Sequence, residues 1–405
     1  MRVPLNRAAL ASGIVAIGFT LNLGPGVPAG AALAPATSTL TYLTGVSCTS
    51  GTSCTAAGFS NTNPPTTTSL AEKWNGTAWA IQHTPNPRGS VFVYGLSCSS
   101  ASACTAVGYS EAPGTTSLAE RWNGTAWAIQ RMPGSPSAGS ILYGVSCASS
   151  AACTAVGTTG SASGGQTPTS LAERWNGTAW AIQRTPNRST PAGGTHLSGV
   201  SCISPTACTA VGFVGGETIP EGDVPLAMAW DGSKWAIQPT PLPRGTNNTN
   251  LNSVSCVSKK ACTAVGYAAN SSGVGAISLA ERWNGAKWVI QHTPNPAGVG
   301  DETTLNGVSC SSPTACTAVG ESYDPVSSAT ASLAETWNGT RWTIQRTVNP
   351  GKVVYLYGVS CSSPTACTAT GRSFGGAVTG WTSLAERWNG ARWAVQRTPN
   401  PSRDR

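Results

Sequence analysis

A pair of tryptophans recurs seven times along this 405-residue chain, and its regularity limits the fold more than any other feature. In the cleanest copy the pair encloses a turn, Trp122-Asn-Gly-Thr-Ala-Trp127. Asn-Gly favours tight turns, and the residues from Leu118 to Trp122 alternate in character, so each copy predicts a β-hairpin. The pairs are Trp74/Trp79, Trp122/Trp127, Trp175/Trp180, Trp230/Trp235, Trp283/Trp288, Trp337/Trp342 and Trp388/Trp393.

The two faces of this hairpin differ in size. One face carries the large Leu118, Trp122, Trp127 and Ile129, whereas the other begins at Ala119 and is mostly small. A single hairpin cannot bury its large face alone. We therefore expect the small face of one repeat to pack over the large face of the next.

The first 34 residues predict a secretory signal peptide. Arg2 and Arg7 precede an apolar segment at Ala8–Leu23, and Ala-x-Ala cleavage patterns follow at 29–31 and 32–34. The alternative is a membrane anchor that stays attached. No later apolar run approaches the ~20 residues of a membrane helix, so we expect the remaining chain to be exported without a membrane span.

Fourteen cysteines form regular C-x5-C pairs, which in an exported chain favour disulfides over zinc or redox sites. Strand-like runs flank each pair, so we expect a hairpin with a five-residue loop cross-linked at its base. The predicted bridges are Cys48–Cys54, Cys98–Cys104, Cys147–Cys153, Cys202–Cys208, Cys256–Cys262, Cys310–Cys316 and Cys361–Cys367.

Two hairpins per repeat give four strands, and the first cysteines of successive repeats are 49 to 55 residues apart. Four strands at this period are typical of a β-propeller. We predict an all-β, seven-bladed propeller at 35–401, with four antiparallel strands and one disulfide per blade, and a tail at 402–405. The blades are expected at about 40–84, 91–133, 140–186, 195–241, 249–294, 303–347 and 354–399.

The stretches Cys104–Tyr109, Leu118–Gly124 and Trp127–Pro133 resemble a kelch-type repeat. The resemblance covers Leu43 to Pro401 and implies that each blade places its first strand innermost and its fourth outermost. The related galactose-oxidase propeller binds copper through histidines and tyrosines. This chain has three histidines, none in such a motif, so we expect no copper, other metal or cofactor. The Trp-Asn-Gly turn also resembles the sialidase Asp-box, but the Ser-x-Asp-x-Gly spacing is absent.

The first and last repeats both look complete, so no strand remains to exchange between the ends of the chain and close the ring. We expect the disulfides within the blades to replace part of that latch.

Loops of variable length fall on one face of the predicted disc, where binding residues are usually found. The candidate binding residues on this face are acidic residues assigned to loops and the one tryptophan outside the repeated pairs, which is assigned to the 2–3 loop of blade seven. Solvated loops are the alternative for the acids, and packing onto its own loop is the alternative for the tryptophan. The candidates are Glu217, Glu221, Asp223, Asp301, Glu302, Glu321, Asp324 and Trp381.

The first strands offer a second candidate site. The residue two positions before the Val or Leu of each first strand is expected to ring the mouth of the central channel. These residues are Thr44, Tyr94, Tyr143, Ser198, Asn252, Asn306 and Tyr357.

Other repeated polar residues predict structural roles. A glutamate recurs once per blade in six blades, and Met228 replaces it in blade four, which indicates a packing position. His83 and His292 take positions held elsewhere by arginine and are expected to be exposed, whereas His196 is assigned to a loop. The Asn-Gly-Thr sequons are explained by turn chemistry.

The net charge of +8 is spread along the chain, so we expect no nucleic-acid partner. We predict a secreted or surface-associated, monomeric, non-enzymatic binding protein for a polysaccharide or an extracellular protein. One alternative is a glycoside hydrolase or lyase using carboxyls from Glu217, Glu221, Asp301 and Glu321. The other is a structural or adhesion coat protein.

Overall fold

The computed structural model describes residues 40–401 except 64–65, 113, 134–138, 161–166, 189–192, 216–221, 270–274, 297–301 and 376–379. The predicted signal peptide and the tail at 402–405 lie outside the described residues. Within the described ranges no helix is long and apolar enough to cross a membrane.

The described chain is all-β, and its strands pair as four-stranded antiparallel meanders in sequence order. The strands of the first four meanders are β1 (Leu40–Ser50), β2 (Ser53–Asn63), β3 (Thr66–Trp74), β4 (Trp79–Gln82); β5 (Val91–Ser100), β6 (Ala103–Ser110), β7 (Thr116–Trp122), β8 (Trp127–Gln130); β9 (Ser140–Ser149), β10 (Ala152–Thr159), β11 (Thr169–Trp175), β12 (Trp180–Gln183); β13 (Gly194–Ser204), β14 (Ala207–Gly215), β15 (Val224–Trp230), β16 (Trp235–Gln238). The strands of the others are β17 (Asn248–Ser258), β18 (Ala261–Ala269), β19 (Ile277–Trp283), β20 (Trp288–Gln291); β21 (Glu302–Ser312), β22 (Ala315–Asp324), β23 (Ala329–Trp337), β24 (Trp342–Gln345); β25 (Val353–Ser363), β26 (Ala366–Phe374), β27 (Trp381–Trp388) and β28 (Trp393–Gln396).

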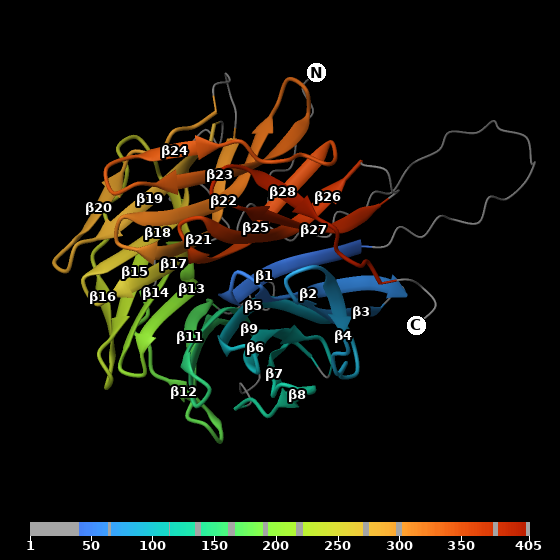
Figure 1. Cartoon of the computed structure of the whole chain (residues 1–405). Coiled ribbons are helices and arrows are strands. Elements are labelled where there is room, and N and C mark those ends of the chain that lie inside the picture. Colours follow the sequence, from blue (N-terminus) through green and yellow to red (C-terminus); the bar gives the residue numbers. More distant parts are fainter. Residues whose placement is uncertain are drawn as a thin grey trace, which may run out of the picture.

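The first strand of each meander lies innermost. Each one contacts the first strands of both neighbouring meanders, and the cycle closes between β25 and β1. In Figure 1 the meanders follow one another in sequence colour until blue β1 lies beside red β25 and β27. This arrangement is a β-propeller, with its fourth strands at the rim.

The core lies between neighbouring meanders, as the two-faced hairpin predicts. Leu118 and Trp127 of the second meander share one buried cluster with Ala57 and Ala71 of the first. Ile129, which was expected on the buried face, is instead 44% exposed. It lies on the short strand β8 at the rim, where it lines an open groove.

The Asn-Gly turns form as predicted, but only the glycine adopts a positive φ. Gly124 has φ of 100°, a backbone conformation that side chains rarely tolerate. Asn123 contributes its side chain instead: its Oδ1 accepts hydrogen bonds from the backbone N–H groups of Thr125 and Ala126, both at 2.9 Å.

All seven predicted disulfides are present, and every cysteine is paired. The expected five-residue loop is wrong. Ser100 pairs with Ala103 beyond the bridge of Cys98 and Cys104, so only two residues turn the chain. The bridge therefore lies within the hairpin, where the two cysteine Cα atoms are 3.9 Å apart. Seven disulfides indicate an oxidising environment.

The ring closes without exchange of a strand, because the first meander consists entirely of the N-terminal strands β1–β4. Leu40 forms a parallel bridge with Trp381 across the closure. The Cys48 backbone N–H also donates to Ser360 Oγ at 2.9 Å. Each disulfide joins two strands of one meander, so the latch role expected for them stays a prediction.

Candidate ligand-binding site on the axial strands

The seven residues expected to ring the channel mouth are all β-bulge residues on the innermost strands. In β1, Leu43 pairs with Gly58 and Gly45 pairs with Ala57, so Thr44 is the extra residue. The bulge lets both Leu43 and Val46 enter the same core cluster. The other bulge residues are Tyr94, Tyr143, Ser198, Asn252, Asn306 and Tyr357.

A second tier lies beside these bulges, and sequence reasoning missed it. It consists of pairs between each first strand and the residue that follows the glycine of the second strand. We call these pairs and the bulge residues together the axial site. The pairs are Tyr42–Phe59, Phe92–Tyr109, Ile141–Thr158, His196–Phe213, Asn250–Tyr267, Thr304–Glu321 and Tyr355–Arg372.

Close backbone approach fixes the glycine before each second-tier residue. A Cβ added to Gly108 would lie 1.8 Å from the carbonyl oxygen of Phe92, so only glycine fits there. The residue after this glycine is Phe in two repeats, Tyr in two repeats, and Thr, Glu or Arg in the others. The residues before the glycine hardly change from repeat to repeat. That contrast was the available signal for the second tier.

Aromatic rings form a continuous arc on the first two meanders. Tyr42 stacks on Phe59 with centroids 4.6 Å apart, and Phe59 meets Phe92 edge-on at 5.1 Å. Phe92 in turn stacks on Tyr109 at 4.9 Å. The contact between Phe59 and Phe92 crosses from the first meander to the second, so packing of neighbouring meanders holds the arc together.

Two predicted ring residues extend this arc. Tyr94 stacks on Tyr143 of the next meander with centroids 5.6 Å apart. Burial raises the pKa of Tyr94 and raises that of Tyr143 to about 12. Both phenols therefore stay neutral at physiological pH.

A second group of aromatic rings surrounds Arg372 on the last meander. The guanidinium carbon lies 4.0 Å from the ring centroid of Trp381, 4.4 Å from that of Tyr42 and 4.8 Å from that of Tyr355. Tyr357 lies 5.8 Å away. Trp381 was assigned to a loop, but it is the first residue of β27, because β26 and β27 pair as far as Phe374.

Glu321 was assigned to a loop after the second strand of its blade and instead lies in β22. Burial raises its pKa to about 8. Asn306 donates to Glu321 Oε2 and to the backbone oxygen of Leu356 at 3.0 Å. Asn252 makes the equivalent bond to Leu305 O at 3.0 Å, so both amides also join neighbouring meanders.

The remaining acidic candidates do not gather in one place among the described residues. Asp223 is buried instead of solvated. When the side-chain amide of Asn250 is oriented with its nitrogen toward Asp223, Asn250 Nδ2 donates a hydrogen bond to Asp223 Oδ2 at 3.2 Å. Burial raises the pKa of Asp223 to about 6. Asp324, assigned to a loop, ends β22 and accepts a bond from the Val326 backbone N–H at 2.8 Å.

Glu217, Glu221 and Asp301 lie outside the described residues, and Glu302 begins β21. Across the described ranges no group of three or more His, Cys, Asp or Glu side chains is placed to hold a metal ion.

His196 was assigned to a loop, but it lies in β13. It stacks on Phe213 with centroids 4.6 Å apart, and burial lowers its pKa to about 4. The pairing of β13 with β14 extends past the bulge and brings this residue into the second tier.

The repeated glutamates lie between meanders. Glu120 is 1% exposed and accepts a hydrogen bond from Ser69 Oγ of the preceding meander at 3.0 Å. Glu173 accepts from Ser117 in the same way. Met228 is also fully buried at this position, so an apolar group of similar length fills it.

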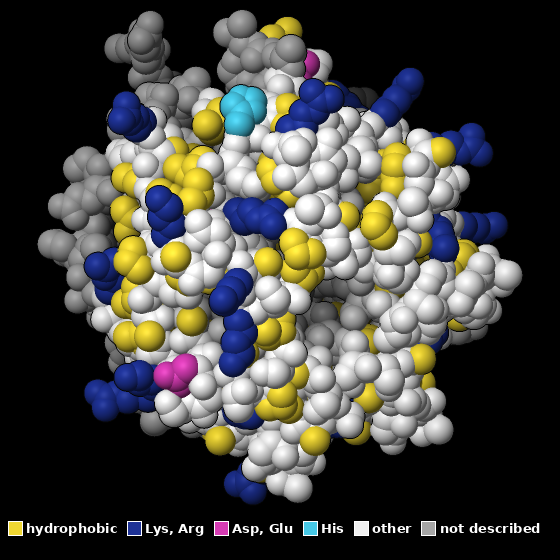
Figure 2. Space-filling model, turned by 60° about the vertical axis from the view of Figure 1, so that its left-hand side comes forward, with side chains coloured by type: hydrophobic (Ala, Val, Ile, Leu, Met, Phe, Trp, Pro, Cys, Tyr) yellow, Lys and Arg dark blue, Asp and Glu magenta, His cyan; other side chains and the backbone are white. Residues whose placement is uncertain are grey.

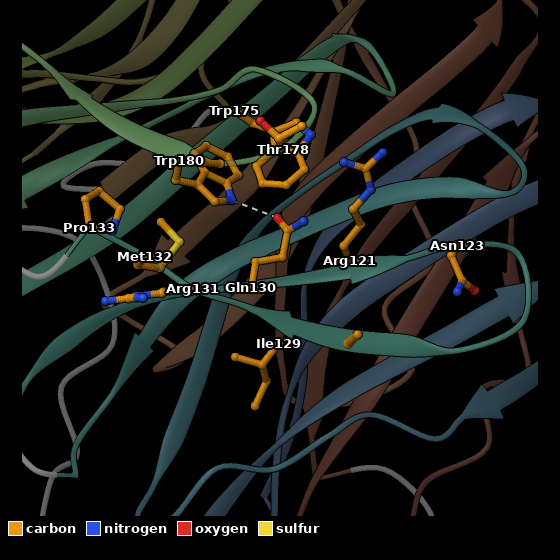
Figure 3. A pocket seen from close by; sticks show the side chains of 12 residues that line it. Arg121, Asn123, Ile129, Gln130, Arg131, Met132, Pro133, Trp175, Thr178 and Trp180 are labelled. Atoms are coloured by element: carbon orange, nitrogen blue, oxygen red, sulfur yellow. Dashed lines mark hydrogen bonds between the residues drawn. The ribbon is translucent and has the colours of Figure 1, made fainter.

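The outer surface, in contrast to the axial site, carries scattered charged side chains. On the face shown in Figure 2, Lys and Arg side chains are scattered and Asp and Glu side chains are sparse. At the rim, a groove of about 610 Å³ runs along the seam between the second and third meanders. Trp180 crosses this seam and donates to Gln130 Oε1 at 2.7 Å (Figure 3).

A similar groove of about 450 Å³ lies at the seam that carries Trp393 and Gln345. Because these grooves follow the packing of the repeat, they distinguish no single position around the ring.

No protein-family model matches the chain, and no curated protein matches its sequence. The GH74 xyloglucanase from Xanthomonas campestris aligns with a TM-score of 0.54 and 12% identity, over 88% of this chain and 54% of that one. The β-propeller domain of the Trilobed protease from Pyrococcus furiosus, with its open velcro topology, aligns with a TM-score of 0.50 and 8% identity. That match covers 89% of this chain and 99% of the domain.

These identities show the fold alone. The chain has a β-propeller repeat fold with a C-x5-C disulfide in each blade, and it spans about half the length of the xyloglucanase.

Proposed function

We propose that this protein is a secreted, non-enzymatic propeller that binds a polysaccharide at the axial site. One observation carries the proposal. The chain has 8 Tyr and 5 Phe, and all but Phe19, Tyr323 and Phe374 belong to the axial site. Aromatic residues needed only for the core would be distributed along all strands. Among the described residues, the hydrophobic clusters between meanders use Leu, Val, Ala, Cys, Met and Trp and contain no Tyr or Phe. Of the axial-site aromatics, Tyr42, Phe59, Phe213 and Tyr267 are buried within the axial site itself.

The proposal includes the wider architecture. We infer that the four-stranded meanders are the seven blades of one ring, since their first strands form a single closed cycle. We also infer export as a monomer. The N-terminal sequence pattern and the seven disulfides support export.

Aromatic side chains suit a sugar ligand for a physical reason. A sugar ring presents an apolar C–H face with polar hydroxyls around its edge, and tyrosine offers a matching apolar face with a polar tip. Tyr94, Tyr143 and Tyr357 are half-buried, so part of each ring stays accessible. These tyrosines lie on paired strands, so their positions are fixed before a ligand binds and little ordering is needed on binding.

The test is a glycan-array screen followed by titration calorimetry on oxidised residues 35–405. We expect saturable binding to at least one polysaccharide. Tyr94→Ala should weaken it about tenfold, the cost of losing one stacked aromatic contact. Tyr323→Ala is the matched control, because Tyr323 lies in β22 outside the axial site, and it should bind like wild type.

Melting curves must show that both variants fold. Absence of glycan binding by the folded protein, or equal binding by Tyr94→Ala and wild type, would refute the proposal. Binding of a surface protein instead of a glycan would also refute it.

A glycoside hydrolase or lyase is the second candidate, and one observation favours it. The pKa of Glu321, raised to about 8, would keep this carboxyl protonated as a general acid. Its test is the release of reducing or unsaturated ends from any bound polysaccharide. Activity abolished by Glu321→Gln with binding intact would favour the enzyme.

A further inference from the structure

We propose that Arg372 makes the axial site selective for an acidic polysaccharide, by binding the carboxylate of a uronic acid residue. This inference rests on the proposed function and names its ligand class. Four aromatic rings surround the guanidinium group of Arg372, whereas Arg121, Arg174 and Arg282 each contact one ring.

Arg372 is held in place without using its hydrogen-bond donors. The rings of Trp381, Tyr42 and Tyr355 lie within 4.8 Å of its guanidinium carbon and fix its position. These ring contacts supply no oxygen or nitrogen acceptor, so they leave the N–H groups of Arg372 without a hydrogen-bond partner.

Among the residues that the structure describes, nothing accepts a hydrogen bond from Arg372. Its Nε is buried without a partner. Two arginines on third strands differ in this respect: Arg174 donates to the backbone oxygen of Pro205 at 2.6 Å, and Arg387 donates to that of Gly51. A buried donor without an acceptor is unfavourable, so an acceptor from a ligand would be stabilising.

The charge of Arg372 is also not neutralised. No described carboxylate forms an ion pair with it. The titratable groups that face it are Glu321 and the phenols of Tyr42, Tyr355 and Tyr357. Burial keeps Glu321 protonated at neutral pH, and the phenol of Tyr357, whose pKa is raised by burial, stays neutral.

The neighbouring groups complete a site for one uronate. A planar guanidinium matches a carboxylate through two parallel N–H···O bonds. The Tyr357 hydroxyl is buried with no hydrogen-bond partner in the described part of the chain, so it can donate a further bond. Phe374, which contacts Trp381 at 5.2 Å and is 43% exposed, extends the aromatic surface on which the sugar ring can stack.

The ring provides one such position. The equivalent second-tier residues are aromatic at four positions, Thr158 at one and Glu321 at one, so Arg372 is the single cation among them. The inference therefore predicts one acidic sugar site per chain.

The experiment is titration calorimetry with oligogalacturonate and with its fully methyl-esterified form, using oxidised residues 35–405. Wild type should bind the acid about tenfold or more tightly than the ester, the worth of a charge-assisted hydrogen-bond pair. The stoichiometry should be one. Arg372→Gln should bind both forms equally, and Arg341→Gln, an exposed arginine on a rim hairpin, should keep the preference.

If Arg372→Gln does not fold, as judged by its melting curve, Glu321→Gln replaces it. Ionisation of Glu321 above pH 8 should weaken acid binding by wild type, and Glu321→Gln should remove this loss. A preference that falls equally in both proteins would overturn the inference.

Equal binding of acid and ester by wild type would overturn this inference and leave the proposed function standing. Binding of polyglutamate with no binding of any glycan would overturn both, since the ligand would then be an acidic peptide. Absence of binding to every probe would also overturn both.

Discussion

Trp79 donates its indole Nε1–H to Gln396 Oε1 at 3.0 Å, which joins the outermost strand of the first meander to that of the last. The same bond crosses the other seams, as between Trp127 and Gln82 at 3.1 Å. Cys54 Sγ likewise contacts Thr368 Oγ1 across the closure at 3.6 Å, as Cys104 contacts Thr55 elsewhere. The closure is therefore built from the contacts of an ordinary seam.

Removing the acceptor at the closure should destabilise the protein as it does at any other seam. Gln396→Ala and Gln130→Ala each leave a tryptophan N–H without its acceptor, so each should lower the free energy of unfolding by about 1 kcal/mol. Urea unfolding followed by tryptophan fluorescence measures both. A much larger loss for Gln396→Ala would mean that the closure is weaker than the other seams.

The repeat pattern predicted the architecture because each blade repeats the same two hairpins and the same packing. It did not predict the second tier. The bulge at Thr44 and its equivalents breaks the period of two, so Tyr42 and Phe59 could not be placed on one face by alternation alone. A single sequence carries no direct signal for that extra residue.

The ends of the strands were also mispredicted, and the reason is tertiary. Trp381 follows a glycine, Asp324 precedes a proline and His196 lies two residues after a pair of glycines, and these turn-like residues indicated loops. Strand pairing carries the ladders past these residues, as in the pair of Phe374 with Trp381. The clustering of aromatic rings around Arg372 depends on that extension and on contact between the first and last meanders.

The buried glutamates should make the protein less stable as the pH rises. Burial raises the pKa of Glu72, Glu281 and Glu335 from 4.5 to about 8, and that of Glu120, for example, to about 7. Between pH 4.5 and the raised pKa of about 7 or 8, the folded protein therefore binds more protons than the unfolded chain. Stability is then fully present below pH 4.5 for these groups and is lost as the pH rises through 7 to 8.

Calorimetric melting from pH 5 to pH 8 tests this sign, and we expect Tm to fall by about 5 °C or more over that range. Glu281→Met, which copies Met228 of the fourth meander, should flatten the profile. Glu111→Gln, at an exposed position, should leave it unchanged. A Tm that rises from pH 5 to pH 8 would contradict the burial of these carboxyls in protonated form.

Each disulfide should contribute modestly, because it closes a short loop. The bridge between Cys98 and Cys104 has a sequence separation of 6. Replacing both cysteines by serine should therefore cost about 2 kcal/mol by the chain-entropy estimate. Urea unfolding measures the loss. If the disulfides also replace a ring latch, full reduction should expose the closure seam first, and hydrogen exchange would show β1 and β25 losing protection before β9 and β13.

The glycine before each second-tier residue should tolerate no side chain. A Cβ at Gly108 would lie 1.8 Å from Phe92 O, and the backbone of β5 would have to move away from β6. Gly108→Ala should therefore destabilise the protein by about 3 kcal/mol or more, in the range of severe overpacking. Gly114→Ala is the control for a general loss of glycine, since no atom lies within 4 Å of an added Cβ there and only its φ of 99° is strained. Chemical denaturation of the two variants decides the matter: a Gly108→Ala protein as stable as Gly114→Ala would mean that β5 and β6 do not approach as closely as the bulged pairing requires.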